Sequence, residues 1–494
     1  MPKTRDHINF LLNDKSVRLT DIPASATLLD YLRLEQRLRG TKEGCAEGDC
    51  GACTVLVGRI SNDRLIYETV NSCIRFLGSL DGCHIVTIEH LKKSDGSLHP
   101  VQQAMVDHHG SQCGFCTPGI VMSLYALWME NPTPSNQEIE IALQGNLCRC
   151  TGYEPIIHAA QAISSIDTPE NDPLKTERDE IKNRLKSFND NARVDIKFEE
   201  EHFIVPASLD DFADARVKYP NSTIVAGSTD VGLWVTKNMR PITPAIFISN
   251  LDELQKINVS ASQISIGAGV TYNDMQDVVE KHIPQLKGFW NRIGGMQVRN
   301  MGTVGGNIAN GSPIGDTPPA LIALGAELRL RCGGKQRSLP IESFFIDYGK
   351  QDRKTGDFLE QINIPIPDPS DFFAVYKISK RRDEDISALC GAFKVRISNG
   401  MISDAKIAFG GMAATPKRAT NVEKKLIGKS WSMDTISTSM VFFEEDYAPL
   451  SDWRASSDYR MLVAKNLLLR FFKEMTSEGE QHQLTREAVL EGLA

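Results

Sequence analysis

The stretch GCAEGDCGACT, residues 44–54, holds three cysteines at the spacing of a loop that binds an iron–sulfur cluster. Cys45, Cys50 and Cys53 are spaced as C-x4-C-x2-C, and Cys73 follows as the single distant thiol that completes a plant-type [2Fe-2S] ligand set. The glycines of this opening loop allow turns of positive φ, in which backbone N–H groups can point at the bridging sulfides of a cluster. The loop therefore predicts an electron carrier.

Two other uses of these cysteines have to be weighed. A disulfide framework requires an oxidising compartment, and 11 cysteines among 494 residues without a secretory signal do not favour one. Zinc is the closer alternative, because C-x2-C is half of many zinc sites. The Cys50/Cys53 pair, however, has no second C-x2-C or H-x3-5-H partner at zinc-finger spacing. The iron–sulfur interpretation is preferred, and zinc stays open as the alternative.

Length and composition indicate a multidomain protein that binds small molecules or other proteins. A chain of 494 residues predicts about three or four units of ~100 to 200 residues each. With a net charge of -8, the chain has no electrostatic footprint for nucleic acid or anionic lipid. The N-terminus is polar where a signal peptide is apolar, and no stretch approaches ~18 consecutive apolar residues. We therefore expect a cytoplasmic protein with neither nucleic acid nor membrane among its partners.

Residues 1–92 carry the pattern of a β-grasp ferredoxin. Residues 7–20 alternate as two strands around a turn at Asn13-Asp14, and residues 27–39 show helical apolar spacing with Gly40 as the expected C-terminal cap. The opening loop comes next, and TVLVGRI, LIYETVNSC and HIVTIEHL complete the strands. Cys83 falls outside the ligand set and is expected to be an ordinary buried thiol.

Residues 93–166 predict a four-helix unit. Pro100 suits the first position of a helix over VQQAMVDHH, and GIVMSLYALWMEN is apolar on nearly every side, as in a buried helix. Ser135 and Glu138 form a capping box before NQEIEIALQ, and EPIIHAAQAISSI predicts the fourth helix.

A second cysteine group lies between these predicted helices. Cys113 and Cys116 form C-x2-C, and Cys148 and Cys150 form C-x-C, so two thiol pairs are expected at the ends of facing helices. Helix N-termini favour the negative charge of a thiolate-ligated cluster. Zinc is possible here too, but C-x-C is an uncommon spacing in structural zinc sites. Two groups of four thiols predict two clusters.

CAEGDCGACTV, QCGFCTPG and NLCRCTGY together resemble the iron–sulfur half of the molybdenum hydroxylases, the xanthine dehydrogenase and aldehyde oxidase group. The resemblance covers roughly residues 5–165 and implies a β-grasp [2Fe-2S] domain followed by a helical [2Fe-2S] domain. It implies that the second cysteine group binds the cluster nearer the molybdenum, with Gln112 and Cys150 against its pterin. The opening loop would then hold the cluster nearer the flavin.

Two glycine-rich runs follow a charged segment, residues 167–194, that we expect to be an exposed linker with a short helix at its centre. In residues 203–232 a predicted helix and the strand TIVAG lead into a turn of small residues. In residues 294–326 so many positions are Gly, Asn or Ser that a nucleotide pyrophosphate explains them better than a core strand does. Neither the G-x-G-x-x-G motif after a strand nor a P-loop is present.

Both runs resemble the FAD-binding domain of the same family, which has the vanillyl-alcohol oxidase fold and would occupy residues 195–368. An aromatic residue commonly stands where this chain has Ile293, and this substitution keeps the contact apolar but changes its geometry. The resemblance implies that FAD is contacted by Ile224, Val225, Ala226, Gly227, Ser228, Thr229, Asp230, Val231, Ile293, Thr303, Val304, Gly305, Gly306, Asn307, Asp316, Leu359 and Lys377.

Residues 369–494 predict a small α+β domain. The Pro-rich residues 362–371 are expected to form a connector, and three alternating strands and a C-terminal amphipathic helix follow. This pattern resembles the C-terminal domain of the family's flavoprotein. The charged loop at residues 379–387 would lie near the isoalloxazine and pyridine-nucleotide sites, although a solvated hairpin explains its charges nearly as well.

No long segment after Ala494 carries a molybdopterin domain, so we expect that domain on a larger partner chain. The resemblance then implies the small subunit of a bacterial-type xanthine dehydrogenase, in a heterotetramer of two small and two large chains. Electrons from oxidation of hypoxanthine and xanthine to urate would pass through two [2Fe-2S] clusters to FAD and on to NAD. No catalytic acid, base or nucleophile is expected on this chain.

Three alternatives remain. One is the iron–sulfur/FAD component of another molybdenum hydroxylase, acting on an aldehyde or an N-heterocycle. The others are a stand-alone electron-transfer flavoprotein and a zinc-stabilised scaffold.

Overall fold

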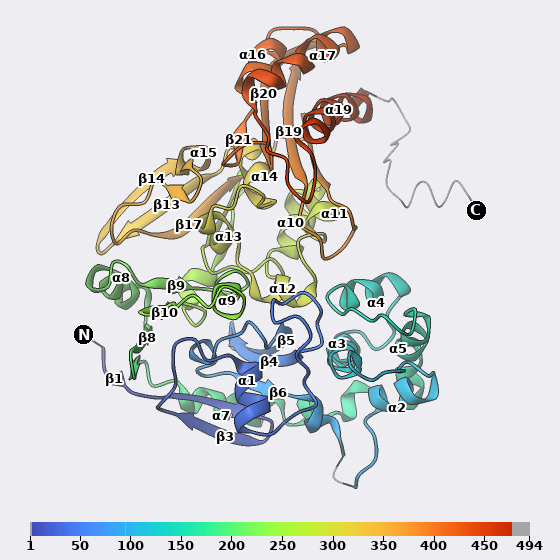
Figure 1. Ribbon diagram of the computed structural model, residues 1–494, viewed down its shortest axis with the longest axis vertical. Coiled ribbons are helices and arrows are strands. Elements are labelled where there is room, and N and C mark those ends of the chain that lie inside the picture. The colour runs from blue at the N-terminus through green and yellow to red at the C-terminus, as the bar shows by residue number, and fades with distance from the viewer. Residues whose placement is uncertain (1, 94, 477–494) are drawn as a thin grey trace.

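The computed structural model describes residues 2–93 and 95–476. In Figure 1 the two N-terminal units, in blue and cyan, lie below a central green and yellow unit, and the orange and red C-terminal unit stands above it. This is the predicted multidomain α+β fold. The last 18 residues of the predicted C-terminal domain, 477–494, lie outside the described part of the chain.

The N-terminal unit is a five-stranded sheet in the order β3-β2-β6-β4-β5, as predicted for a β-grasp. Strand β2 pairs parallel with β6, and the remaining neighbours are antiparallel. Residues on one face of these strands, such as Phe10 and Val55, are fully buried, which explains the alternating pattern in the sequence. The strands are β2 (Ile8–Leu12), β3 (Lys15–Leu19), β4 (Thr54–Ser61), β5 (Arg64–Asn71) and β6 (His84–Val86).

The helix predicted over residues 27–39 is wrong at its C-terminal end. Helix α1 (Leu28–Asp30) continues into a π-turn over Tyr31–Glu35, and Arg37 then adopts a φ of 59°, which a helix cannot continue through. Gly40 is not the cap. This position has no room for a side chain, because a Cβ there would lie 2.3 Å from Ile88 Cγ2. The Gly40 N–H donates to Glu89 Oε1 at 2.7 Å.

The second unit has the four predicted helices, α2 (Pro100–Asp107), α3 (Thr117–Glu130), α4 (Asn136–Leu143) and α5 (Glu154–Ile166). Ser135 and Glu138 form the predicted capping box of α4. A second capping box at α2 uses His99 and Gln102. Helix α3 is buried along most of its length, as its apolar sequence predicted.

Residues 167–194 are more ordered than an exposed linker. They form α6 (Pro173–Thr176) and α7 (Arg178–Phe188), and Leu174, Ile181 and Leu185 are buried in the core that α3 and α5 also share. Ile181 and Leu185 are four residues apart and therefore lie on one helix face. The few apolar residues of this charged segment are thus enough to fasten it to the units before it.

The central unit contains two five-stranded sheets, β1-β7-β8-β10-β9 and β11-β12-β17-β13-β14. Strand β1, from the chain's N-terminus, pairs parallel with β7, so that Thr4 faces Arg193. The strands of the first sheet are β1 (Thr4–Arg5), β7 (Arg193–Phe198), β8 (Glu201–Val205), β9 (Thr223–Val225) and β10 (Ala245–Phe247). Those of the second sheet are β11 (Ile257–Val259), β12 (Gln263–Gly267), β13 (Glu327–Cys332), β14 (Lys335–Pro340) and β17 (Phe358–Pro365).

Short helices lie around these two sheets (Figure 1). They include the elements that hold both glycine-rich runs, α9, α12, α13 and α14. The helices are α8 (Leu209–Lys218), α9 (Val231–Thr236), α10 (Gln276–His282), α11 (Lys287–Trp290), α12 (Met296–Met301), α13 (Val304–Asn310), α14 (Thr317–Leu324) and α15 (Ile341–Phe344), and β15 (Phe345–Asp347) pairs with β16 (Lys350–Gln351).

The C-terminal unit has the three predicted strands, β18 (Asp371–Ile378), β19 (Leu389–Ser398) and β20 (Met401–Gly410), with β21 (Lys417–Arg418) added at the edge. The predicted connector over residues 362–371 is shorter, because Ile362 and Ile364 are buried as the end of β17 and Asp371 begins β18. The helices are α16 (Thr420–Leu426), α17 (Met433–Ser439), α18 (Phe443–Asp446) and α19 (Ser457–Thr476).

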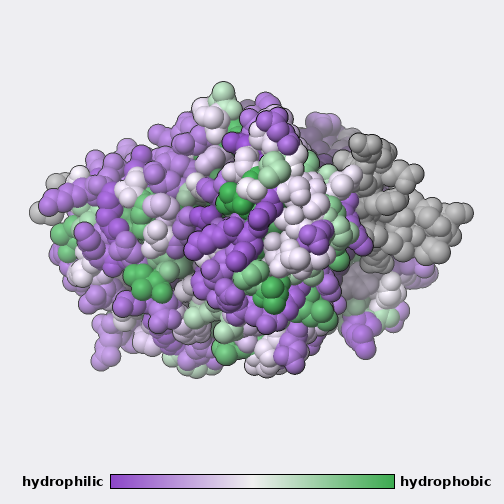
Figure 2. All heavy atoms as spheres, turned by 90° about the horizontal axis from the view of Figure 1, so that it is seen from above, coloured by the Kyte–Doolittle hydropathy of each residue, from purple (hydrophilic) through white to green (hydrophobic). Residues whose placement is uncertain are grey.

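None of the helices within the described ranges is long and apolar enough to cross a membrane. Figure 2 shows the molecule from the C-terminal unit's side, where hydrophilic residues cover most of the face and apolar ones form small separate groups.

Candidate functional site

The three cysteines of the opening loop and Cys73 come together as a linked group of thiols. The Cys45 thiol contacts those of Cys50 and Cys73, and the Cys53 thiol contacts that of Cys73. Cys45 Sγ also accepts the backbone N–H of Cys50 at 3.4 Å and that of Glu47 at 3.5 Å. Hydrogen bonds from the Cys50 and Cys73 thiols lower the pKa of Cys45, and the same contact with Cys45 raises the pKa of Cys73. The loop thus offers a donor set that suits thiolate ligation.

The second cysteine group also has thiols in pairs. Cys148 Sγ lies 3.8 Å from Cys150 Sγ, which lies 3.7 Å from Cys113 Sγ. A tetrahedral metal with metal–sulfur bonds of about 2.3 Å holds two thiolates about 3.8 Å apart. Burial raises the pKa of Cys116 to about 12. Burial also raises that of Cys148, but hydrogen bonds from Thr151 outweigh it and lower the value to about 7.

Within residues 2–93 and 95–476, no three His, Cys, Asp or Glu side chains are arranged to hold a metal ion. A [2Fe-2S] cluster needs a different arrangement, because each of its irons takes two thiolates and shares the inorganic sulfides. The paired thiols of both groups fit that requirement.

A backbone hydrogen bond joins the two cysteine groups directly. The N–H of Leu147, next to Cys148, donates to the carbonyl of Cys50 at 3.0 Å. A Cβ on Gly51 would lie 2.0 Å from the carbonyl oxygen of Gly145, so this glycine lets the helical unit approach the opening loop.

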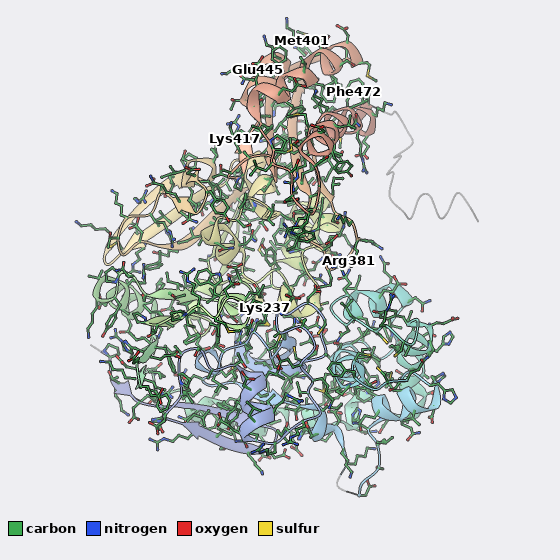
Figure 3. The ribbon with its side chains drawn as sticks, in the orientation of Figure 1. Lys237, Arg381, Met401, Lys417, Glu445 and Phe472 are labelled. Atoms are coloured by element: carbon green, nitrogen blue, oxygen red, sulfur yellow. The ribbon has the colours of Figure 1, made fainter. Side chains whose placement is uncertain are left out.

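The opening loop contacts the central unit on its other side. Thr236 Oγ1, at the end of α9, donates to the carbonyl of Ala46 at 2.6 Å, and Lys237 pairs with Glu47 at 3.7 Å. Figure 3 labels Lys237 at this boundary. The opening loop therefore lies between the second cysteine group and the glycine-rich runs.

The two glycine-rich runs cross closely. A Cβ on Gly227, in the turn after β9, would lie 1.6 Å from the carbonyl oxygen of Met301. Ser228 follows in the left-handed region with a φ of 58°. Thr303 caps α13 by accepting the N–H of Gly306 at 2.9 Å. The crossing gives a cradle of backbone in which phosphate oxygens could be bound.

A cavity of about 220 Å³ lies beside the cradle and is lined by four of the predicted FAD contacts, Ile293, Asn307, Asp316 and Lys377. Lys377 Nζ and Asp316 Oδ2 form a buried ion pair at 2.6 Å. Asn307 Oδ1 is buried and has no hydrogen-bond partner among the described residues, so it can accept from a ligand. The donor set fits a polar ring such as that of a flavin.

Four family models match consecutive parts of the chain. Residues 10–75 match a 2Fe-2S iron–sulfur cluster binding domain, and residues 87–161 match a [2Fe-2S] binding domain. Residues 196–367 match the FAD binding domain in molybdopterin dehydrogenase, and residues 374–475 match the CO dehydrogenase flavoprotein C-terminal domain.

Full-length relatives agree with these matches. Xanthine dehydrogenase 1 of Arabidopsis thaliana is 31% identical over 92% of this chain, and xanthine dehydrogenase/oxidase of Rattus norvegicus is 32% identical over 95%. The chain belongs to the iron–sulfur/FAD part of the molybdenum hydroxylase family. It spans only 38% and 39% of the lengths of these two relatives.

Two solved oxidoreductase structures are similar to about half of the chain. A carbon monoxide dehydrogenase from Hydrogenophaga pseudoflava has a TM-score of 0.52 and 25% identity, covering 54% of this chain and 94% of its own. Quinoline 2-oxidoreductase from Pseudomonas putida 86 has a TM-score of 0.50 and 25% identity, covering 55% and 94%.

The other residues predicted from the molybdenum hydroxylase resemblance lie in different places. Ala226, Gly227 and Thr303 line a larger cavity, of about 490 Å³, between the central and N-terminal units. Gln112 is exposed beside Cys113. The residues that line neither cavity are Ile224, Ser228, Thr229, Asp230, Val231 and Gly306, around the cradle, and Val225, Val304, Gly305 and Leu359, which are buried. Their contacts with FAD stay predictions.

Sequence reasoning missed two acidic residues in this molybdenum hydroxylase site. Asp49, from the opening loop, and Glu384, from the loop at 379–387, both line the 220 Å³ cavity. Burial and a hydrogen bond with Asp49 raise the pKa of Glu384 from 4.5 to about 8. The charges of that loop were visible in the sequence, but its approach to the opening loop depends on tertiary packing.

Proposed function

We propose that the chain is the electron-transfer subunit of a xanthine dehydrogenase. A partner chain with the molybdenum cofactor would oxidise hypoxanthine and xanthine to urate. Electrons would enter at the second cysteine group, pass the opening loop and reach FAD, from which NAD accepts them. A cytoplasmic location belongs to the same proposal.

One observation carries this proposal: the opening loop lies between the second cysteine group and the cavity proposed for FAD. Cys50 accepts the N–H of Leu147 on one side of the loop, and Asp49 lines the cavity of Lys377 and Asp316 on the other. Each cluster, when bound, would accept and release single electrons, and FAD would collect two and pass them on as a hydride. The chain's own contribution is placement, through the eight cysteine thiols, the crossing at Gly227 and the Lys377–Asp316 pair.

The proposed partner suits the exposed surface around the second cysteine group. Cys113 and Cys150 are exposed, and beside them Phe115 and Leu147 expose 47% and 40% of their surface. Exposed apolar side chains next to a redox site favour a protein that covers them. We propose a molybdenum-cofactor chain there, with Gln112 facing its pterin, in a heterotetramer of two small and two large chains.

The choice of xanthine rests on the relatives that align along nearly the whole chain. The similar structures of carbon monoxide dehydrogenase and quinoline oxidoreductase cover about half of it, and they support the alternative of another molybdenum hydroxylase, for an aldehyde or an N-heterocycle. A stand-alone electron-transfer flavoprotein is the alternative without a partner.

Affinity purification of the chain from its native host tests these possibilities. We expect a larger molybdenum-containing chain to co-purify and the complex to form urate from xanthine while reducing NAD. A complex that oxidises only an aldehyde or another heterocycle would replace xanthine as the substrate. A chain that oxidises NADH with no partner would contradict the subunit assignment, and zinc without acid-labile sulfide would contradict the clusters.

A further inference from the structure

Gln297 is a fully buried amide at the contact of three structural units. It is the second residue of α12 in the central unit, and its exposed fraction is 0%. Its Nε2 lies 2.9 Å from Asn146 Oδ1, 3.1 Å from Thr54 Oγ1 and 3.3 Å from Ser123 Oγ. Thr54 follows Cys53 directly, and Asn146 lies two residues before Cys148. One side chain of the central unit therefore contacts the ligand segments of both predicted clusters.

The carbonyl group of Gly51 determines how the side chains of Asn146 and Thr54 are oriented in this network. The carbonyl oxygen of Gly51 can only accept, so the Nδ2 of Asn146, at 3.1 Å, must be the group that faces it. Asn146 Oδ1 then faces Gln297, which has to present its NH2 group. Thr54 Oγ1 donates to the carbonyl of Gly51 at 2.6 Å and is therefore free to accept from Gln297. An amide with two N–H donors is the group that this position requires.

Glycines bring the backbone of all three units close to this amide. A Cβ on Gly145 would lie 2.0 Å from Gln297 Oε1, and a Cβ on Gly295 would lie 2.5 Å from the Cα of Gly145. Gln297 Oε1 itself has no hydrogen-bond partner among the described residues. Burying an amide oxygen in this way costs stability. Packing alone would be better served by an apolar side chain.

The rest of α12 contacts the same neighbours. Asn300 Nδ2 donates to the carbonyl of Thr69 at 2.9 Å, and Met301 Sδ accepts the N–H of Asn71 at 3.3 Å. Arg299 donates to Gln144 Oε1 at 3.0 Å. After α12 the chain passes through Gly302 to Thr303, which is the N-cap of α13 in the predicted FAD cradle. A shift of α12 relative to either cysteine group would therefore also move the predicted FAD cradle.

We propose that Gln297 is a positioning residue that sets the distances between the two clusters and FAD. This inference rests on the proposed electron-transfer function and adds a residue that touches neither redox site. Its amide joins the side chain of Thr54, next to Cys53, to the side chain of Asn146, two residues before Cys148. Helix α12 then leads to the FAD cradle, so the same contacts set the position of the cradle. Gln297 takes part in no covalent or redox step, because it acts only by positioning the units around it.

The test compares Gln297→Met with Gln336→Met in the full chain loaded with clusters and FAD. Met has a similar volume but no N–H donor. Gln336 is the control for the loss of an amide, because it is an exposed residue whose amide donates to Glu360 in the same sheet at 3.0 Å, away from both cysteine groups. The measurements are iron, sulfide and FAD content, the magnetic interaction between the two reduced clusters in EPR spectra, and the rate of electron transfer from the clusters to FAD.

We expect Gln297→Met to keep its iron and FAD, to change the magnetic interaction and to slow electron transfer several-fold, while Gln336→Met behaves as the unmodified chain. Ser123→Ala removes the most distant of the three contacts and the hydrogen bond from Ser123 Oγ to Asn146 Oδ1 at 2.7 Å, but it leaves the Gln297 amide in place. It should change the same quantities in the same direction by less. An unchanged interaction and rate in Gln297→Met would overturn the proposal. If Gln297→Met does not fold, unchanged values in Ser123→Ala would overturn it. If the unmodified chain shows no second cluster signal, the result contradicts the proposed electron-transfer function itself, and with it this inference.

Discussion

Neighbouring glycines at 305 and 306 have different surroundings, although the sequence presents them as one motif. A Cβ on Gly305 would lie 2.4 Å from the carbonyl oxygen of Ala268, so this glycine is required by packing. Gly306 is exposed, and a Cβ there would meet only the Thr303 side chain, at 2.7 Å. Only Gly306 is open to a ligand at the cradle.

Substitution should separate these two roles. Gly306→Val is expected to yield flavin-poor protein with intact clusters, because the side chain would occupy the approach to the cradle. Gly305→Ala should instead lower the free energy of unfolding by about 1–3 kcal/mol through overpacking. FAD content by absorbance and thermal unfolding measure the two effects. Full FAD occupancy in Gly306→Val would contradict the proposed cradle.

Cys50 is the most direct test of the opening loop. Its thiol contacts that of Cys45, and its carbonyl accepts from Leu147. Cys50→Ala should abolish one of two distinguishable [2Fe-2S] EPR signals and halve the iron content, while the second cysteine group keeps its cluster. Cys83→Ala, which removes a buried thiol outside both groups, is the control. Retention of both signals in Cys50→Ala would remove the assignment.

Glu384 makes a pH-dependent contribution to stability. Its pKa is raised from 4.5 to about 8 by burial and by Asp49, against the opposing effect of Arg299. The folded state therefore binds this proton more tightly than the unfolded state, and stability falls as the pH rises from about 4.5 to about 8. Glu384→Gln should stay neutral, so its melting temperature should exceed that of the unmodified chain by an amount that grows across this window.

Thermal unfolding at several pH values measures that difference, with a shift of about 2–4 °C for each kcal/mol in a domain of this size. Glu445→Gln is the control, because Glu445 is exposed on the C-terminal unit, where Figure 3 labels it. A difference between Glu384→Gln and the unmodified chain that is constant with pH would contradict the buried, protonated state.

Among the elements, the segment of α6 and α7 shows how a charged sequence becomes part of a core. Asp172, before α6, is buried and accepts hydrogen bonds from His99 at 2.9 Å and from Tyr125 at 2.7 Å. Because His99 Nδ1 accepts the N–H of Val101, its Nε2 must carry the proton that Asp172 accepts. This network joins the segment to α2 and α3.

Asp172→Asn should destabilise the helical unit by about 1.5–3 kcal/mol, the range for a hydrogen bond to a charged group. The amide cannot accept from His99, Tyr125 and the backbone together as the carboxylate does. Thermal unfolding provides the measurement. Asp179→Asn, at an exposed position in the first turn of α7, should have a much smaller effect. Equal effects of the two substitutions would show that the buried network does not stabilise this junction.

Across the whole molecule, the second cysteine group is more exposed than the cysteines of the opening loop and Cys73. Cys113 and Cys150 are exposed, whereas Cys53 and Cys73 are buried. In Figure 1 the helical unit that carries the second group lies at one side of the N-terminal unit, away from the C-terminal helix α19. An electron path that starts at this exposed surface and ends at the 220 Å³ cavity suits a subunit with a partner.

Phe115→Ala should therefore weaken the association with the larger chain without loss of cluster or FAD. Removing a large exposed apolar side chain from an interface often costs 1 kcal/mol or more, which corresponds to roughly a five-fold or greater loss in affinity. Leu462→Ala, at a 58% exposed position on α19, is the control. Co-purification and titration of the two chains measure the effect, and equal recovery of partner by both variants would contradict a partner at this surface.

Local chemistry explains why much of the fold could be predicted. The capping box at Ser135, the strand pattern of β18 to β20 and the paired cysteine spacings each depend on residues close in the sequence. The predicted end of the helix over residues 27–39 was wrong because Arg37 leaves the helical region of φ, and no capping residue at that position indicates this in the sequence. The prediction of an exposed linker at residues 167–194 was wrong because the composition is dominated by charged residues, although the few apolar ones are buried.

The sequence by itself determined the two cysteine groups, the two glycine-rich runs and the order of the units, because these depend only on residue spacing and periodicity along the chain. Only the tertiary structure decided that Gly305 packs while Gly306 is open, that Asp49 and Glu384 meet, and that Gln297 contacts residues beside both cysteine groups. Those facts depend on which backbones cross, and contacts such as Gln297 with Thr54 join residues 243 positions apart. Pairing over such distances arises from the packing of whole units and leaves no local signal in the chain.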